Sequence, residues 1–190
     1  MADRARVGIL LSGRGSNMQA LVAASREGNA RYEVVLVASD KPEAPGLAWA
    51  AEQGIATFAA SPKGRLKAEY EAEVDAALRD AGVEVVALAG YMRLLSPAFV
   101  QRWAGRILNI HPSLLPKYKG LDTHARAIAA GDAVAGASVH LVTEALDDGP
   151  VIAQAEVPVE PGDTPDTLAA RVLTAEHRLY PQALDRFLSR

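Results

Sequence analysis

The stretch Val7-Gly8-Ile9-Leu10-Leu11-Ser12-Gly13-Arg14-Gly15-Ser16-Asn17 places a short apolar run directly before a loop with two glycines. The run has the length and aliphatic content of a buried β-strand, and a helix is expected to begin at about Ser16. A strand that passes through a tight loop into a helix is the repeating unit of α/β folds. The stretch therefore predicts a βα unit at the start of the chain.

The same alternation continues along the chain. Further strands are expected at 34–38, 85–88 and 107–110, and helices at 47–53, 65–81, 96–103 and 123–130. This order predicts a parallel sheet with helices on both faces. Two later strands, 138–142 and 151–157, are joined by the loop 143–150 and are expected to be antiparallel, and Thr164-Pro165-Asp166 opens a last long helix. The predicted fold class is α/β, with a Rossmann-like, mostly parallel open sheet and an antiparallel strand pair toward the C-terminus.

Composition narrows the class of protein further. The 190 residues suit one domain, 1–190, and the net charge of −3 argues against broad binding to nucleic acid or to acidic membranes. The absence of cysteine excludes disulfides, thiolate nucleophiles and cysteine metal sites. No stretch approaches the roughly 20 apolar residues of a membrane span, and the N-terminal run Met1 to Arg6 lacks the pattern of a signal peptide. A cytoplasmic protein that acts on a small molecule is predicted.

Four polar segments follow the predicted strands at the same edge of the sheet. They are 13–17, 90–95, 109–116 and the loop that carries Asp147. In open α/β sheets, ligands bind beyond the carboxyl ends of the strands. The four segments are therefore expected to meet at one crevice.

The loop 12–17 has two interpretations of about equal weight. Its backbone N–H groups and the following helix N-terminus can bind a phosphate, or the loop is simply a tight turn. Met18 occupies the third glycine position of a dinucleotide-binding fingerprint, which disfavours a nicotinamide cofactor. Asp40 keeps that alternative open because it lies where a ribose-binding acid would be. The segment 90–95 suits the wall of a pocket for a flat heteroaromatic ligand, or strand-to-helix packing.

Asn109, His111 and Asp147 carry the side-chain chemistry. An Asn amide can hold a developing oxyanion, an imidazole can exchange a proton near neutral pH, and a carboxylate beside it favours its protonated form. Asn109 and His111 are two apart on a strand end, so they point the same way. Considered without the other motifs, Asn109 would be interpreted as an amide in a turn and His111 as a buried core imidazole. The other three histidines, His124, His140 and His177, are assigned structural or supporting roles, and no zinc site is expected.

These residues resemble the glycinamide ribonucleotide formyltransferase family, over nearly the whole chain. The resemblance rests on Ser12 to Asn17, Leu88 to Pro97, Asn109 to Gly120, Ser138 to His140, Leu146 to Ile152, and Glu176-His177. It implies transfer of a formyl group from 10-formyltetrahydrofolate, a co-substrate, to the amino group of phosphoribosylglycinamide, without a metal. It also implies a phosphate-binding half, about 1–100, and a folate-binding and catalytic half, about 101–190.

The same resemblance implies the roles of individual residues. The catalytic residues would be Asn109, His111 and Asp147. The phosphoribosyl substrate would bind at Gly15, Ser16, Asn17, Leu173 and Glu176, with Leu173 at a position where relatives often carry a polar side chain. The folate would bind at Lys67, Met92, Arg93, Leu94, Leu95, Asn109, Thr143, Glu144, Ala145, Leu146 and Asp147, with Lys67 near its glutamate tail.

Three alternatives stay open at the level of sequence. A hydrolase would release formate from the same folate without an acceptor. Another formyltransferase would act on a sugar amine or on an aminoacyl-tRNA, and the latter is expected to need a basic surface and an added RNA-binding domain. A nicotinamide-binding module comes from a different class. The protein is expected to be a monomer or a homodimer without nucleic-acid or membrane partners.

Overall fold

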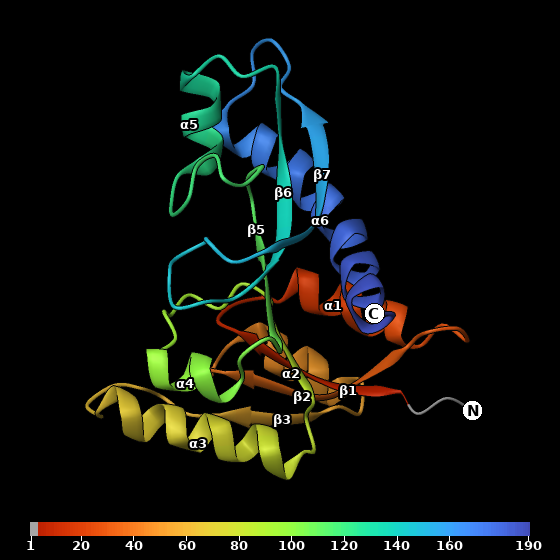
Figure 1. The fold of residues 1–190 in the computed structure, drawn as a ribbon, viewed down its shortest axis with the longest axis vertical. Helices are drawn as coiled ribbons and strands as arrows, with labels where there is room; N and C mark the ends of the chain where they lie inside the picture. The colour runs from red at the N-terminus through yellow and green to blue at the C-terminus, as the bar shows by residue number, and fades with distance from the viewer. Residues whose placement is uncertain (1–3) are drawn as a thin grey trace.

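The computed structural model describes residues 4–190, and residues 1–3 of the N-terminal run considered above lie outside the described residues. Figure 1 shows strands and helices alternating along most of the chain. The elements are β1 (Ala5–Leu11), α1 (Ser16–Ser25), β2 (Tyr32–Ser39), α2 (Pro45–Glu52), β3 (Ala56–Ala59), α3 (Lys67–Asp80), β4 (Val85–Leu88), α4 (Pro97–Arg102), β5 (Ile107–His111), α5 (Thr123–Ala129), β6 (Val134–Leu141), β7 (Val151–Pro158) and α6 (Pro165–Leu188).

The strands form one seven-stranded sheet in the order β3-β2-β1-β4-β5-β6-β7. The first five strands in this order are parallel, and β6 is antiparallel to both β5 and β7. The predicted α/β fold with a mostly parallel sheet and a late antiparallel pair is confirmed. The antiparallel pairing of β5 with β6 is an addition to that prediction.

The largest differences from the predicted strands concern β3 and β6. β3 was not predicted, because its four residues are mostly exposed and carry no continuous apolar run. β6 begins at Val134, four residues before the predicted start at Ser138, because residues 134–137 pair with β7. The start of α6 is as predicted, with Thr164 as the N-cap and Pro165 in the first turn.

Side chains alternate between two cores, one on each face of the sheet. Ile9 and Leu11 of β1 pack in the core shared with α1, α2 and α6, whereas Leu10 packs in the core shared with α3 and α4. Helix α6 runs along β6 and β7 and reaches α1 (Figure 1). The hydroxyl of the fully buried Tyr180 on α6 lies 2.9 Å from the carbonyl oxygen of Leu88 and 3.1 Å from that of Leu108. This contact ties α6 to β4 and β5, the strands that lead to the candidate site.

No helix among residues 4–190 is both long and apolar enough to cross a membrane.

Candidate active site

Asn109 and His111 lie at the end of β5 and, two residues apart, share one face of the strand. His111 is buried, and its Nε2 lies 2.8 Å from the carbonyl oxygen of Tyr118. A carbonyl only accepts, so Nε2–H is the donor, and this assigns the protonated nitrogen. The Nδ1 atom of His111 is left facing the carboxylate of Asp147. The contact fixes which edge of the imidazole is available to the site.

Asp147 reaches His111 from the loop between β6 and β7. Its Oδ2 lies 3.4 Å from His111 Nδ1 and accepts a 2.9 Å hydrogen bond from the backbone N–H of Gly120. The backbone of Asp147 is left-handed, with φ of 49°, which is uncommon for a residue other than glycine. The loop closes tightly beside it, because a Cβ at Gly149 would collide with the carbonyl oxygen of Leu141. The carboxylate is therefore held in place by contacts outside its own loop.

His140 belongs to the same cluster, although only a structural or supporting role was predicted for it from the sequence. The antiparallel register places His140 of β6 directly opposite Asn109 of β5. Its Nε2 lies 3.4 Å from Asn109 Nδ2 and 3.7 Å from Asp147 Oδ1. Its Nδ1–H donates to the Leu141 carbonyl at 3.0 Å. The sequence signal that could have found it is cross-strand pairing, which requires the register to be known.

Burial determines the charge of His140. The residue is 2% exposed, and this desolvation lowers the pKa of its imidazole despite the nearby Asp147 carboxylate. In the neutral ring, Nε2 carries a lone pair, since Nδ1 carries the hydrogen. His140 can thus accept a hydrogen bond from the amide of Asn109 and orient it.

The loop 12–17 leads into the N-terminus of α1. Gly15 has a φ of 72°, a conformation that favours glycine, and a Cβ there would lie 2.8 Å from Leu11 Cδ2, which would have to shift. Within the described residues 4–190, no side chain caps the helix start. The free N–H groups of the first turn, which includes Ser16, are suited to bind an anion.

Asn17 and Glu176 join this loop to α6. Asn17 Nδ2 donates to Glu176 Oε1 at 3.1 Å, and both side chains are buried. Asn17 Oδ1 is buried without a hydrogen-bond partner among the described residues. Burial raises the pKa of the Glu176 carboxyl to about 7, although the hydrogen bond from Asn17 opposes the shift. Leu173 lies three residues earlier on α6 and is partly buried, on the same side of the helix.

Asp40 has a role within the protein that does not require a ribose. Its buried carboxylate accepts a 2.6 Å hydrogen bond from Ser12 Oγ, which in turn accepts from the backbone N–H of Met92 at 2.9 Å. The Ser12 backbone N–H also donates to the Gly90 carbonyl. Asp40 and Ser12 therefore join the loop after β1 to the segment after β4.

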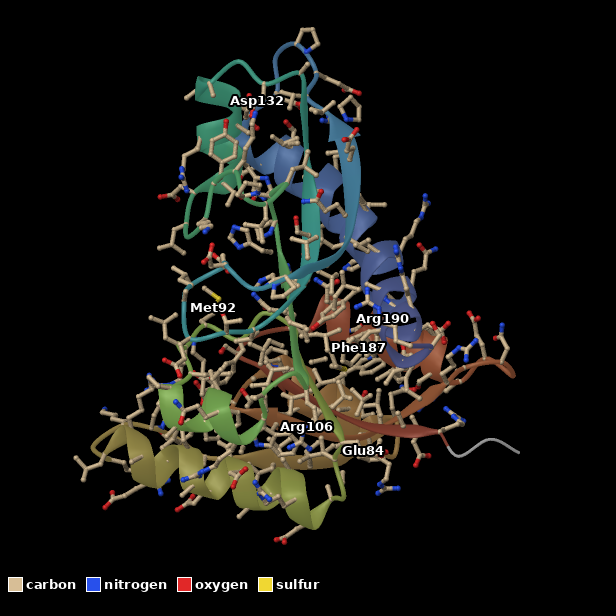
Figure 2. The ribbon with its side chains drawn as sticks, in the orientation of Figure 1. Glu84, Met92, Arg106, Asp132, Phe187 and Arg190 are labelled. Atoms are coloured by element: carbon tan, nitrogen blue, oxygen red, sulfur yellow. The ribbon has the colours of Figure 1, made fainter. Side chains whose placement is uncertain are left out.

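The segment 92–95 divides into two kinds of side chain. Met92, labelled in Figure 2, is 70% exposed and Leu94 is 66% exposed. By contrast, Arg93 stacks over the Tyr70 ring at 5.5 Å and Leu95 packs against the core shared with α3 and α4. Only Met92 and Leu94 are free to contact a ligand with their full side chains.

The remaining predicted folate residues are exposed. Thr143, Glu144, Ala145 and Leu146 form the loop before Asp147, and Leu146 is an exposed apolar side chain. Lys67 is the exposed first residue of α3, and among residues 4–190 no hydrogen bond or ion pair joins it to the cluster.

A cavity of about 320 Å³ lies on the other side of the segment 112–118, beside α5. Its lining includes Tyr118 and His124 but none of Asn109, His111 and Asp147. Burial lowers the pKa of His124. Asp132, which also lines the cavity, lies near the α5 end of the molecule (Figure 2). Within residues 4–190, no group of three or more His, Asp or Glu side chains could hold a metal ion.

An α/β sheet with an amide, imidazole and carboxylate cluster at the carboxyl end of β5 matches a known class of enzyme. The profile of the formyl transferase family matches residues 5–184, and the chain belongs to this family. It is 48% identical over 180 residues to the phosphoribosylglycinamide formyltransferase of Escherichia coli (strain K12). This match covers 94% of this chain and 85% of that protein. The solved phosphoribosylglycinamide formyltransferase from Brucella melitensis is 54% identical, with a TM-score of 0.95 over 99% of this chain and 97% of that chain.

A larger relative contains the same region. The chain is 44% identical over 182 residues to the human trifunctional purine biosynthetic protein adenosine-3, and the match covers 95% of this chain. It spans only 18% of the length of that relative.

Proposed function

We propose that the protein transfers the formyl group of 10-formyltetrahydrofolate to the amino group of N1-(5-phosphoribosyl)glycinamide, a step of purine biosynthesis. The products are the formylglycinamide ribonucleotide and tetrahydrofolate. The observation that carries this proposal is the cluster of Asn109, His111 and Asp147 on two adjoining segments. Membership of the formyl transferase family and the names of the E. coli and Brucella relatives support it.

Asn109 is the proposed oxyanion donor. Its Nδ2 carries two hydrogens, and one faces His140 Nε2 at 3.4 Å. The other is free to donate to the formyl oxygen as negative charge develops during attack by the substrate amine. A donor already oriented by a neighbour costs no reorganisation when the charge appears.

His111 and Asp147 are the proposed proton-transfer groups. The new C–N bond forms between the glycinamide nitrogen and the formyl carbon, and the bond from that carbon to the folate nitrogen breaks. His111, protonated on both ring nitrogens in this step, gives its Nδ1 proton to the departing folate nitrogen and keeps the Nε2–H that faces the Tyr118 carbonyl. Asp147 accepts the proton lost by the amine through a water molecule, so that the protons balance.

The two ends of the site suit the two substrates. The N-terminus of α1 at Gly15, Ser16 and Asn17 would bind the phosphate, and Glu176 would accept hydrogen bonds from the ribose, beside Leu173. The exposed side chains of Met92 and Leu94 offer an apolar surface for a flat folate ring, and the exposed residues Thr143 to Leu146 would supply further contacts. The Lys67 ammonium would bind the glutamate tail of the folate.

We also propose that residues 1–190 act as one domain, with a phosphate-binding half of about 1–100 and a folate-binding and catalytic half of about 101–190. The continuous seven-stranded sheet supports this. The net charge of −3 supports small-molecule substrates rather than nucleic acid. We propose a cytoplasmic monomer or homodimer.

The test is an assay with and without the acceptor. The purified protein is incubated with 10-formyltetrahydrofolate, or a dideaza analogue, and the folate product is followed by absorbance. We expect product only when phosphoribosylglycinamide is added. Product without acceptor would identify a hydrolase, and no product together with saturable NADH binding would favour the nicotinamide-binding alternative.

A further inference from the structure

Two loops supply polar groups that contact the pair formed by His111 and Asp147. The first, residues 112–122, provides the Tyr118 carbonyl and the Gly120 N–H. The second, residues 142–150, carries Asp147 itself. Both loops extend to the same side of the sheet (Figure 1). The position of the carboxylate therefore depends on how the second loop is held against the first.

The first loop is anchored firmly to its surroundings. Arg126 of α5 donates to the carbonyl oxygens of Lys119 at 2.7 Å and Leu121 at 3.1 Å, and it stacks over the Tyr118 ring at 5.1 Å. The Tyr118 hydroxyl donates to Asp132 at 2.6 Å. These contacts make the first loop a fixed support.

The second loop is held less firmly at its tip. Residues 143–146 are exposed, and the left-handed backbone of Asp147 is intrinsically disfavoured. Glu144 accepts a 2.8 Å hydrogen bond from Gln101 at the entrance of the loop. At the tip, the side-chain links to the first loop are an ion pair from Lys119 to Asp148 and the hydrogen bond from Gly120 to Asp147. The two links are in adjacent positions, 119 and 120 on one loop and 148 and 147 on the other.

We propose that Lys119 and Asp148 are positioning residues for the formyl transfer proposed above, because their ion pair holds the loop 142–150 in the arrangement that places Asp147 against Gly120 and His111. Asp148 is the residue next to Asp147, so fixing its side chain limits the movement of the Asp147 backbone. The Lys119 ammonium also lowers the pKa of the Asp148 carboxyl. The inference rests on the proposed function.

The expected effect is modest because the pair is partly in solvent, with the Lys119 side chain 38% exposed and that of Asp148 57% exposed. Exposed pairs contribute little to global stability, so we expect the free energy of unfolding to stay nearly constant. The position of the loop 142–150, and with it that of Asp147, should change instead. Breaking the pair is expected to lower kcat and to raise KM for the folate, so that kcat/KM for the folate falls about three- to ten-fold. The KM for the glycinamide substrate should change less.

The experiment compares Lys119→Glu, Asp148→Lys and the double variant that exchanges the two charges. We measure kcat and both KM values, and hydrogen exchange of the backbone amides of residues 142–150 in the ligand-free protein. Each single variant should lose activity and exchange faster in this loop, and the double variant should recover most of both. Raising the salt from about 0.05 M to about 0.5 M should narrow the difference between the wild type and Lys119→Ala, because salt screens exposed charges.

The matched control is Arg31 with Asp185, another exposed pair, 3.4 Å apart, between the start of β2 and the end of α6. Exchanging those charges should leave loop exchange and kinetics unchanged. The proposal is overturned if the single variants at 119 and 148 match the wild type, or if their losses simply add in the double variant. Hydrogen exchange requires no substrate, so it tests the ion pair even if the protein shows no formyl transfer activity. Absence of that activity would contradict the proposed function alone.

Discussion

The regions at the carboxyl ends of β1 and β5, two interior strands of the sheet, prepare their binding groups in different ways. At the β1 end, the anion site is made of main-chain N–H groups at the start of α1, shaped by the left-handed Gly15. At the β5 end, the site is made of side chains from β5, β6 and the loop after β6. A main-chain site is encoded by a few consecutive residues, whereas a side-chain cluster depends on which strands pair and in which register. A main-chain site can be recognised from a short stretch of sequence, whereas a side-chain cluster can be recognised only once the pairing of the whole sheet is known.

The largest effect should follow from removing the proton-transfer groups at the β5 end. His111→Ala and Asp147→Asn are each expected to lower kcat about 10²- to 10⁴-fold, because proton transfer by a positioned side chain contributes that much. Binding of both substrates should largely survive. Steady-state kinetics and a binding titration separate the two quantities, and His177→Gln on α6 is a control of the same residue type. A near-normal rate in either variant would remove that residue from the mechanism.

The next effect concerns the β1 end, where Glu176 is buried beside Asn17. Its folded-state pKa of about 7 lies above the ordinary value of 4.5, so an unfolded chain loses this proton first as the pH rises. The free energy of unfolding should therefore fall between about pH 4.5 and pH 7, by about 3 kcal/mol from this group alone, and then level off. Urea unfolding at several pH values should show a flatter dependence for Glu176→Gln. Parallel curves for the two proteins would contradict the assignment.

A smaller effect is expected for His140, which acts through Asn109. His140→Ala removes the acceptor that orients the amide, and we expect kcat to fall about ten-fold, the equivalent of one hydrogen bond. His140→Gln, which can still accept through its amide oxygen, should recover part of the loss. Because the folded ring is neutral, the pH profile of kcat should keep its shape in both variants. A changed profile would mean that His140 itself exchanges protons.

The smallest effect is expected at Lys67, on α3. Lys67→Ala should leave kcat unchanged and raise KM less than about three-fold for a folate with several glutamates, because a single exposed charge contributes little. A folate with one glutamate should show a smaller change. Equal KM values for wild type and variant with both folates would remove Lys67 from the folate site.

Much of the fold follows from periodicity. The buried runs of β1 and β4, the caps at Ser96 and Thr164 and the long α6 all have strong local signals. β3 does not, because an edge strand of four mostly exposed residues lacks the apolar pattern on which the prediction depends. The early start of β6 was missed because residues such as Gly136 are placed in a strand by pairing with β7 and not by their own propensity.

The sequence alone determined the chemistry available to this protein: the glycine loop, the Asn109 and His111 pair on one strand face, and the carboxylate of Asp147. These follow from residue type and short-range spacing, which local geometry controls. Only the tertiary structure decided their surroundings. The antiparallel register of β5 and β6 brought His140 to Asn109, α6 brought Glu176 to Asn17, and the meeting of two loops paired Lys119 with Asp148. The physical reason is that such contacts join residues far apart in the chain, and packing of the whole sheet sets their distance.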